Sequence, residues 1–252
     1  MLKSFTYLTV FLMFTGLYAQ EQEMSRANTI EIHEGGKVHA GPEVTYKGGR
    51  VHLALGQGGT VGYEIDKITK IVSPMPTRLR QMWGAFLGGN FGAVAGSAGE
   101  KVVEELKFLG WGKRAAFAYG YALIKEGKFK EAQPIFSRAF GYVRGVDDKL
   151  DNQLLTLGIA AAELANNKDA NAKKGIAKVV KELEPEAKAL YYNIEGDLFM
   201  KDGDENQAVL SYYKTLLLDK TNPYERAYAK SKIQAVYKKL KDPRAEQIKS
   251  LN

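Results

Sequence analysis

Apolar residues along this chain follow two different periods, and the change between them divides the sequence into two parts. From Thr29 to Val72 apolar and polar residues alternate, as in short half-buried strands. Beyond Thr77 the apolar residues recur at three- and four-residue steps, as in amphipathic helices. We therefore predict an α+β protein, with a small antiparallel β module at residues 20–73 and an all-α region at residues 77–252.

The alternating part predicts short strands separated by glycine-rich turns. The strands are expected at residues 29–33, 44–46, 50–55, 61–65 and 68–72. Four or five short strands predict a small, curled, SH3-like or Sm-like barrel, whose core would be marginal without further packing. Two prolines, Pro74 and Pro76, then end the strand pattern, and we place the domain boundary there.

The helical part is organised around residues 115–140. Apolar and small residues follow a helical period on both sides of Gly127: Ala116, Tyr119, Gly120 and Leu123 before it, and Phe129, Ala132, Phe136 and Ala139 after it. Gly120 and Ala132 are small enough to let two antiparallel helices approach closely, and Phe136 fills the space beside them. The stretch therefore predicts a helical hairpin.

The same residue types recur 38 positions apart. The series are Gly120, Gly158 and Gly196; Ala132, Ala170 and Ala208; and the hinges Gly89, Gly127, Ala165 and Gly203. Only the middle copy departs, with Lys174 in the place of Phe136. This pattern resembles a tetratricopeptide repeat (TPR), although the usual repeat is about 34 residues long. The resemblance implies an α-solenoid of hairpins at about 77–113, 114–151, 152–189 and 190–223, closed by a cap at 224–252.

The resemblance also implies that the first helix of each unit lines a groove for a peptide or partner protein. With Gly120 at the eighth place of the repeat, the groove residues would be Trp83, Phe86, Arg114, Phe117, Tyr121, Lys125, Asn152, Asn193, Asp197 and Lys201. Aromatic and arginine side chains dominate binding energy at interfaces. The alternative is that these aromatic side chains complete the packing between helices. Some TPR modules clamp a peptide carboxylate from the fifth and ninth places, but here Phe117 and Tyr121 occupy those places.

A second interpretation rests on residues 81–99, which carry no charge. Glycines fall at every fourth position, at Gly84, Gly88, Gly92 and Gly96. On one continuous helix they would form a glycine zipper, which predicts a membrane-associated oligomer. Six glycines weaken helix propensity, however. We therefore favour two helices, at about residues 77–88 and 91–108.

A third interpretation is a β module that binds a metal or another ligand. All three histidines, His33, His39 and His52, lie in the β part. Strand alternation predicts that His33 and His52 face solvent, and their spacing matches no strong metal motif. We find no phosphate loop, serine elbow or zinc-protease motif. The sequence therefore favours a protein that is not an enzyme and needs no cofactor.

The amino-terminal residues indicate export. Residues 1–19 resemble a secretory signal peptide, with Lys3 before an apolar run from Phe5 to Leu17 and Ala19 before the cleavage point. That run is short for a membrane span of about 20 residues, although a retained anchor is the alternative. The chain has no cysteine, which excludes disulfides, thiolate metal sites and a lipidated amino-terminal cysteine. We expect a periplasmic or cell-envelope protein that is not a lipoprotein.

Positive charge gathers at the carboxyl end. The chain has a formal net charge of +7, and residues 228–252 contain seven basic and two acidic residues. In an exported protein this indicates an anionic envelope surface, an acidic partner or a solvated polar cap, rather than nucleic acid. Taken together, the patterns predict an exported, non-catalytic scaffold for protein–protein interaction.

Overall fold

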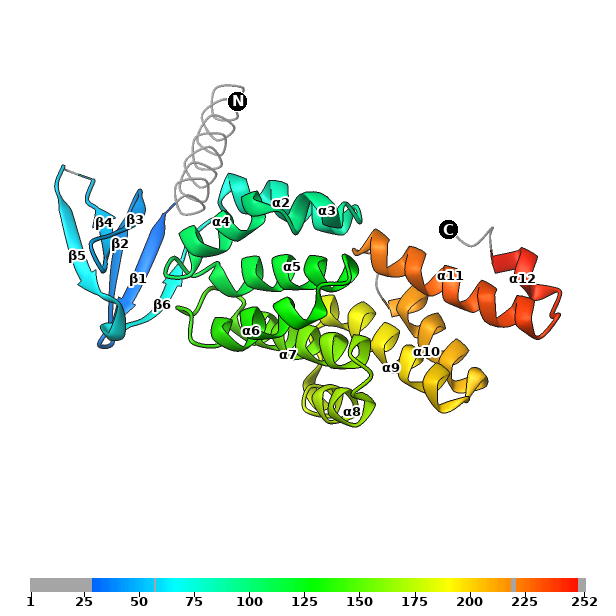
Figure 1. Ribbon diagram of the computed structural model, residues 1–252. Coiled ribbons are helices and arrows are strands. Elements are labelled where there is room, and N and C mark those ends of the chain that lie inside the picture. Colours follow the sequence, from blue (N-terminus) through cyan, green and yellow to red (C-terminus); the bar gives the residue numbers. More distant parts are fainter. Residues whose placement is uncertain (1–28, 57, 219–220, 249–252) are drawn as a thin grey trace, which may run out of the picture. The chain divides into compact units, whose positions relative to one another are not determined.

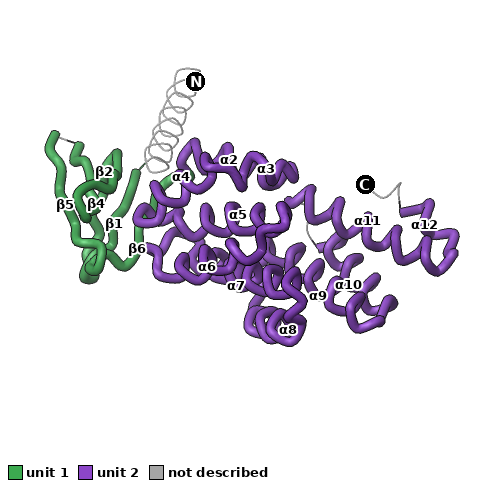
Figure 2. Tube along the Cα trace, viewed as in Figure 1, with its two compact units in different colours: residues 1–75 green, residues 76–252 purple. Residues whose placement is uncertain are grey.

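The computed structural model describes residues 29–56, 58–218 and 221–248 (Figure 1). The chain divides into two compact units, residues 1–75 and 76–252 (Figure 2). Two small antiparallel sheets precede a mostly helical region, so the predicted α+β composition is confirmed. The predicted signal peptide at residues 1–19 lies outside the described residues.

Six strands form two three-stranded antiparallel sheets in the first unit. One sheet has the order β2-β1-β6 and the other the order β3-β4-β5. The strands are β1 (Ile30–Glu34), β2 (Lys37–Gly41), β3 (Val44–Lys47), β4 (Arg50–Ala54), β5 (Thr60–Glu64) and β6 (Ile68–Val72), with a one-turn helix η1 (Ile65–Lys67) before β6. The core of the unit consists of Ile32, Val51, Leu53, Tyr63, Ile68 and Ile71.

The sequence did not predict strand β2, because one of its few apolar residues, Val38, is 55% exposed and the alternation is lost. The strand forms because Gly35 and Gly36 take positive φ angles of 53° and 79° and fold the chain back onto β1. At its end, Gly41 lies against β4: a Cβ there would be 2.1 Å from the Ala54 carbonyl oxygen. A glycine is therefore needed where these two strands meet.

The histidines of this unit are half-buried rather than fully solvent-facing. His33 Nε2 lies 3.4 Å from a Glu31 carboxylate oxygen, and His52 Nε2 lies 3.1 Å from the Lys47 carbonyl oxygen. The ring of His39 packs on Tyr63 with 5.1 Å between the ring centroids. Within residues 29–56, 58–218 and 221–248, no group of three or more His, Cys, Asp or Glu side chains could hold a metal ion.

The second unit is built from helices that pair in chain order. They are α2 (Thr77–Leu87), α3 (Phe91–Val94), α4 (Ser97–Leu106), α5 (Gly112–Lys125), α6 (Phe129–Ala139), α7 (Asp148–Ala165), α8 (Asp169–Ala177), α9 (Lys188–Asp202), α10 (Glu205–Leu218), α11 (Pro223–Lys239) and α12 (Arg244–Gln247). From α5 onward they form hairpins: α5 with α6, α7 with α8, α9 with α10, and α11 with α12 (Figure 1). We call α5, α7, α9 and α11 the first helices of these hairpins.

The glycine-rich segment does not form one continuous helix. Helix α2 ends at Leu87, Gly89 takes a positive φ of 74°, and the backbone is extended at Gly96 before α4 begins. The four glycines of the proposed zipper therefore do not line one face of one helix, and the single helix expected at 91–108 is two. No helix in the described part of the chain is long and apolar enough to cross a membrane.

Glycines stand where the helices of a hairpin cross. A Cβ on Gly120 would lie 2.6 Å from the Phe136 ring, and one on Gly196 would lie 2.5 Å from the Tyr212 ring. Gly158 differs, because its close neighbour is Phe136 of the preceding hairpin, at 2.7 Å. Phe136 is thus held between two glycines on successive first helices.

The hairpin of α7 and α8 is shifted by two residues from the predicted register. The hinge is Asn167, with a positive φ of 57°, rather than Ala165, which ends α7. In α8, Ala172 is fully buried whereas Ala170 is exposed, and Ile176 rather than Lys174 takes the apolar place. Equivalent alanines, Ala132, Ala172 and Ala208, are therefore 40 and 36 residues apart. The longer helix α7 moves the hinge, and the next unit compensates.

Candidate functional site

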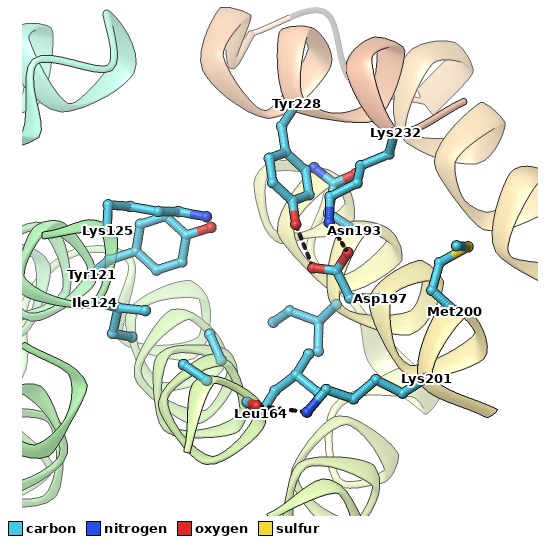
Figure 3. A pocket seen from close by; sticks show the side chains of 13 residues that line it. Tyr121, Ile124, Lys125, Leu164, Asn193, Asp197, Met200, Lys201, Tyr228 and Lys232 are labelled. Carbon is cyan, nitrogen blue, oxygen red and sulfur yellow. Dashed lines mark hydrogen bonds and ion pairs between the residues drawn. The ribbon is translucent and has the colours of Figure 1, made fainter. Parts of the chain in front are cut away.

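A pocket of about 450 Å³ opens between the four first helices (Figure 3). Half of the predicted groove residues line it: Tyr121 and Lys125 from α5, and Asn193, Asp197 and Lys201 from α9. Helix α7 contributes apolar side chains, and α11 contributes Tyr228 and Lys232. Residues from four separate helices thus meet at one site.

Four other predicted groove residues, Trp83, Phe86, Arg114 and Phe117, line a second cavity of about 140 Å³. Phe86 and Phe117 are each only 2% exposed, and their ring centroids are 5.5 Å apart. Phe86 also contacts Phe91, which packs edge-on against Tyr224 of α11 at 4.6 Å. These rings join α2, α3, α5 and α11, so they belong to the core, the alternative that the sequence had left open.

Arg114 is a buried ion-pair partner. Its Nε donates a hydrogen bond of 2.5 Å to Asp151 on α7, and its guanidinium lies 5.2 Å from the Trp83 ring centroid. Burial raises the pKa of Asp151, while the charge of Arg114 opposes that rise. Asn152, the tenth predicted residue, lines neither cavity, because it is hydrogen-bonded to Lys113 and Asp148. Both side chains hold α5 against α7.

A buried carboxylate connects helices far apart in the sequence. Glu225 on α11 is 1% exposed and accepts hydrogen bonds of 2.9 Å from the Tyr121 hydroxyl and 2.6 Å from Asn193 Nδ2. Tyr121 and Asn193 line the larger pocket, whereas Glu225 lines the smaller cavity. This hydrogen-bonded bridge therefore divides the inner side of the hairpins into two sections.

The Glu225 carboxylate makes stability depend on pH. Burial raises the pKa of Glu225, opposed by Lys125 and by the hydrogen bonds from Asn193 and Tyr121. Because the pKa of Glu225 in the folded protein is raised above its usual value of 4.5, this carboxyl group stabilises the fold fully at pH values below 4.5. That stabilisation is lost as the pH rises through the folded-state pKa. We expect the free energy of unfolding of the wild type, relative to Glu225→Gln, to fall between about pH 4 and about pH 7.

Urea unfolding of both proteins at the two pH values measures this difference. Titration of the exposed carboxylates is common to both proteins and cancels in the comparison. A difference that stays constant, or that grows with pH, would show that Glu225 is not held with a raised pKa.

Asp197 has three hydrogen-bond donors around its carboxylate. It accepts from the hydroxyl of Tyr228 at 2.6 Å, and Lys232 Nζ lies 3.1 Å away (Figure 3). It also accepts from the hydroxyl of Tyr212 at 2.7 Å. Burial and the charge of Asp197 raise the pKa of both tyrosines well above its usual range. These hydroxyls therefore stay protonated and act as donors within the protein.

Lys125 is placed differently. Its ammonium lies 4.7 Å from the ring centroids of both Tyr121 and Tyr228, and 5.3 Å from that of Tyr224. Figure 3 shows its Nζ directed into the open pocket, with no dashed line joining it to another side chain drawn there. Burial lowers the pKa of Lys125, and the charges of Glu225 and Asp197 oppose this. The pocket therefore presents a cation held among aromatic rings.

Three of the residues that build the site, Glu225, Tyr228 and Lys232, were not predicted. All lie on α11, in the stretch assigned to the cap at residues 224–252. Glu225 stands three residues after Asn222, whose side chain caps α11 by accepting from the Glu225 amide. An acidic residue is ordinary in the first turn of a helix, so no local signal distinguished Glu225 from an exposed acid.

Comparison with protein-family models, curated proteins and solved structures finds no match. The site itself therefore has to indicate the function. Its lining offers aromatic faces, apolar side chains from α7 and the Lys125 ammonium, while Asp197, Lys201 and Lys232 are held by neighbours.

Proposed function

We propose that this protein is an exported, non-catalytic interaction scaffold whose TPR-like hairpins bind a peptide segment of a partner protein. The observation that carries the proposal is the convergence of α5, α7, α9 and α11 on one open pocket of about 450 Å³. A pocket of this size holds a few side chains. Its walls are ordered before binding by Glu225 and Asp197, which lowers the entropic cost of association.

The first unit is, in this proposal, a small SH3-like or Sm-like barrel. The support is its set of six short strands in two sheets, with the one-turn helix η1 leading into β6, which returns to pair with β1. The proposal of export rests on the signal-like residues 1–19.

Filling the pocket tests the binding function. Ala165 ends α7, is exposed and lines the pocket, so Ala165→Trp should occupy the space without disturbing the core. We expect peptides selected from a displayed random library on the full chain to bind the variant at least about tenfold more weakly, because their side chains lose the pocket. Fluorescence anisotropy with labelled peptides measures the affinity.

The matched control is Ala170→Trp, which places the same side chain at an exposed site on α8 outside the pocket. It should leave the affinity unchanged. If the selection yields no binding peptide, or if both variants bind equally well, the pocket is not the binding site.

A further inference from the structure

Lys125 differs from the other cations of the pocket in its hydrogen bonding. Lys201 donates to the Leu164 carbonyl, Asn167 and Asp169, and Lys232 pairs with Asp197. Within the described residues, Lys125 Nζ has no hydrogen-bond acceptor, although it lines the same pocket (Figure 3). An ammonium group has three N–H donors, and none of these donates to another of the described residues.

The surroundings leave Lys125 no internal acceptor. The two carboxylates that act on it electrostatically are Glu225 and Asp197. Glu225 is taken by Tyr121 and Asn193, and Asp197 is taken by two tyrosines and Lys232. The three tyrosine rings around Lys125 attract its charge, but they accept no strong hydrogen bonds. The cation is thus held in position with its donors free.

We propose that Lys125 binds a carboxylate of the bound peptide. A charge-assisted hydrogen bond from an ammonium to a carboxylate is about twice as strong as a neutral one. A carboxylate brings one negative charge to the Lys125 cation. Asp197, in the same pocket, would repel a dianionic phosphate about twice as strongly as a carboxylate. The inference rests on the proposed peptide-binding function and names the chemistry that this site selects.

The carboxylate has two possible sources, an Asp or Glu side chain and the peptide carboxyl terminus. An array of random nonapeptides, each synthesised in matched forms, separates them. One pair differs only by Glu or Gln at a single position, and the other only by a free or an amidated carboxyl terminus. The full-length protein is the probe. A peptide is counted as bound in the pocket only if it binds the wild type and loses that binding in the Ala165→Trp variant.

We expect one acid-to-amide change in these peptides to weaken binding about tenfold or more. In Lys125→Met that discrimination should disappear, so that the acid and amide forms bind alike, whereas Lys125→Arg should retain most of it. Lys173→Met is the matched control, because Lys173 lies outside the pocket and its ammonium pairs with Asp202, and this variant should discriminate like the wild type. If Lys125→Met no longer distinguishes the Glu peptide from the Gln peptide, Lys125 binds a side-chain carboxylate. If it no longer distinguishes the free from the amidated carboxyl terminus, Lys125 binds the terminal carboxylate.

The outcomes separate this inference from the proposed function. Some peptides could bind the wild type but not the Ala165→Trp variant, and bind equally well as acids and as amides. Such peptides would overturn the carboxylate inference without contradicting the proposal of peptide binding. Discrimination that persists unchanged in Lys125→Met would also overturn it, because another group would then recognise the carboxylate. If no peptide on the array loses binding in the Ala165→Trp variant, both the carboxylate inference and the proposed function are contradicted.

Discussion

Replacing Asp151 with leucine is expected to lower the free energy of unfolding by about 3–5 kcal/mol, because the change leaves a buried charge without its partner. Arg114 is 6% exposed, and its hydrogen bond to Asp151 joins α5 to α7. The other carboxylate near it, Asp147, is 3.4 Å away and half exposed, so it compensates only in part. Urea unfolding of the full chain measures the loss.

The double variant Arg114→Met/Asp151→Leu should lose much less than the sum of the single changes. Replacing both members of a buried pair with apolar residues is often close to neutral, since the cost of desolvating both charges disappears. The raised pKa of Asp151 agrees with this, because desolvation outweighs the attraction of Arg114 there. A double variant as unstable as the single one would show that the ion pair is needed for more than its own desolvated charges.

A surface ion pair provides the comparison. Lys173 on α8 lies 2.7 Å from Asp202 on α9, and both side chains are nearly half exposed. Lys173→Met should cost at most about 1 kcal/mol, since exposed pairs contribute little. If Asp151→Leu lowered the free energy of unfolding no more than Lys173→Met does, Arg114 would not be a structural residue. The prediction that Arg114 lines a binding groove would then be favoured again.

Replacing Gly120 or Gly196 with leucine is expected to cost on the order of 1–3 kcal/mol or more, because the added side chain overpacks a helix crossing. Already the first added carbon would lie 2.6 Å from the Phe136 ring or 2.5 Å from the Tyr212 ring. Both rings are fully buried and have no room to move away. The shift of the urea midpoint for each variant tests the expectation.

The matched control is Gly84→Leu on α2, where an added Cβ would meet nothing within 4 Å. Leucine is a better helix former than glycine by roughly 0.5–1 kcal/mol, so this variant should be as stable as the wild type or more stable. Midpoints for the Gly120 and Gly196 variants that match that of Gly84→Leu would show that close approach at the crossings is not required.

Local patterns in the sequence were sufficient for most of the elements and for the crossings inside a hairpin. Gly120, Ala132 and Phe136 lie within 16 residues of one another, and helix period alone brings them to one crossing. The same holds for Gly196 and Tyr212. Such contacts are predictable because the path between the residues is one short loop.

The predicted register of the repeats is wrong where one unit is longer than 38 residues and the next is shorter. A fixed spacing of 38 residues matched the glycines, but helix α7 is longer, and Asn167 supplied the positive φ expected of Ala165. Strand β2 was missed for a related reason, because Val38 is exposed and the strand depends on its turn and on its pairing with β1. In both cases a neighbouring element outweighed the local pattern.

By itself, the sequence determined the two-part α+β organisation and the hairpins, because each follows from a period of a few residues. It also placed in the groove ten residues, of which five line the larger pocket. Only the tertiary structure decided that Phe86 and Phe117 are core, that Glu225 joins Tyr121 to Asn193, and that the Lys125 ammonium lies among three tyrosine rings. Tyr121 and Glu225 are 104 residues apart. Their meeting depends on the summed rotation of every hairpin between them, and no local period encodes that sum.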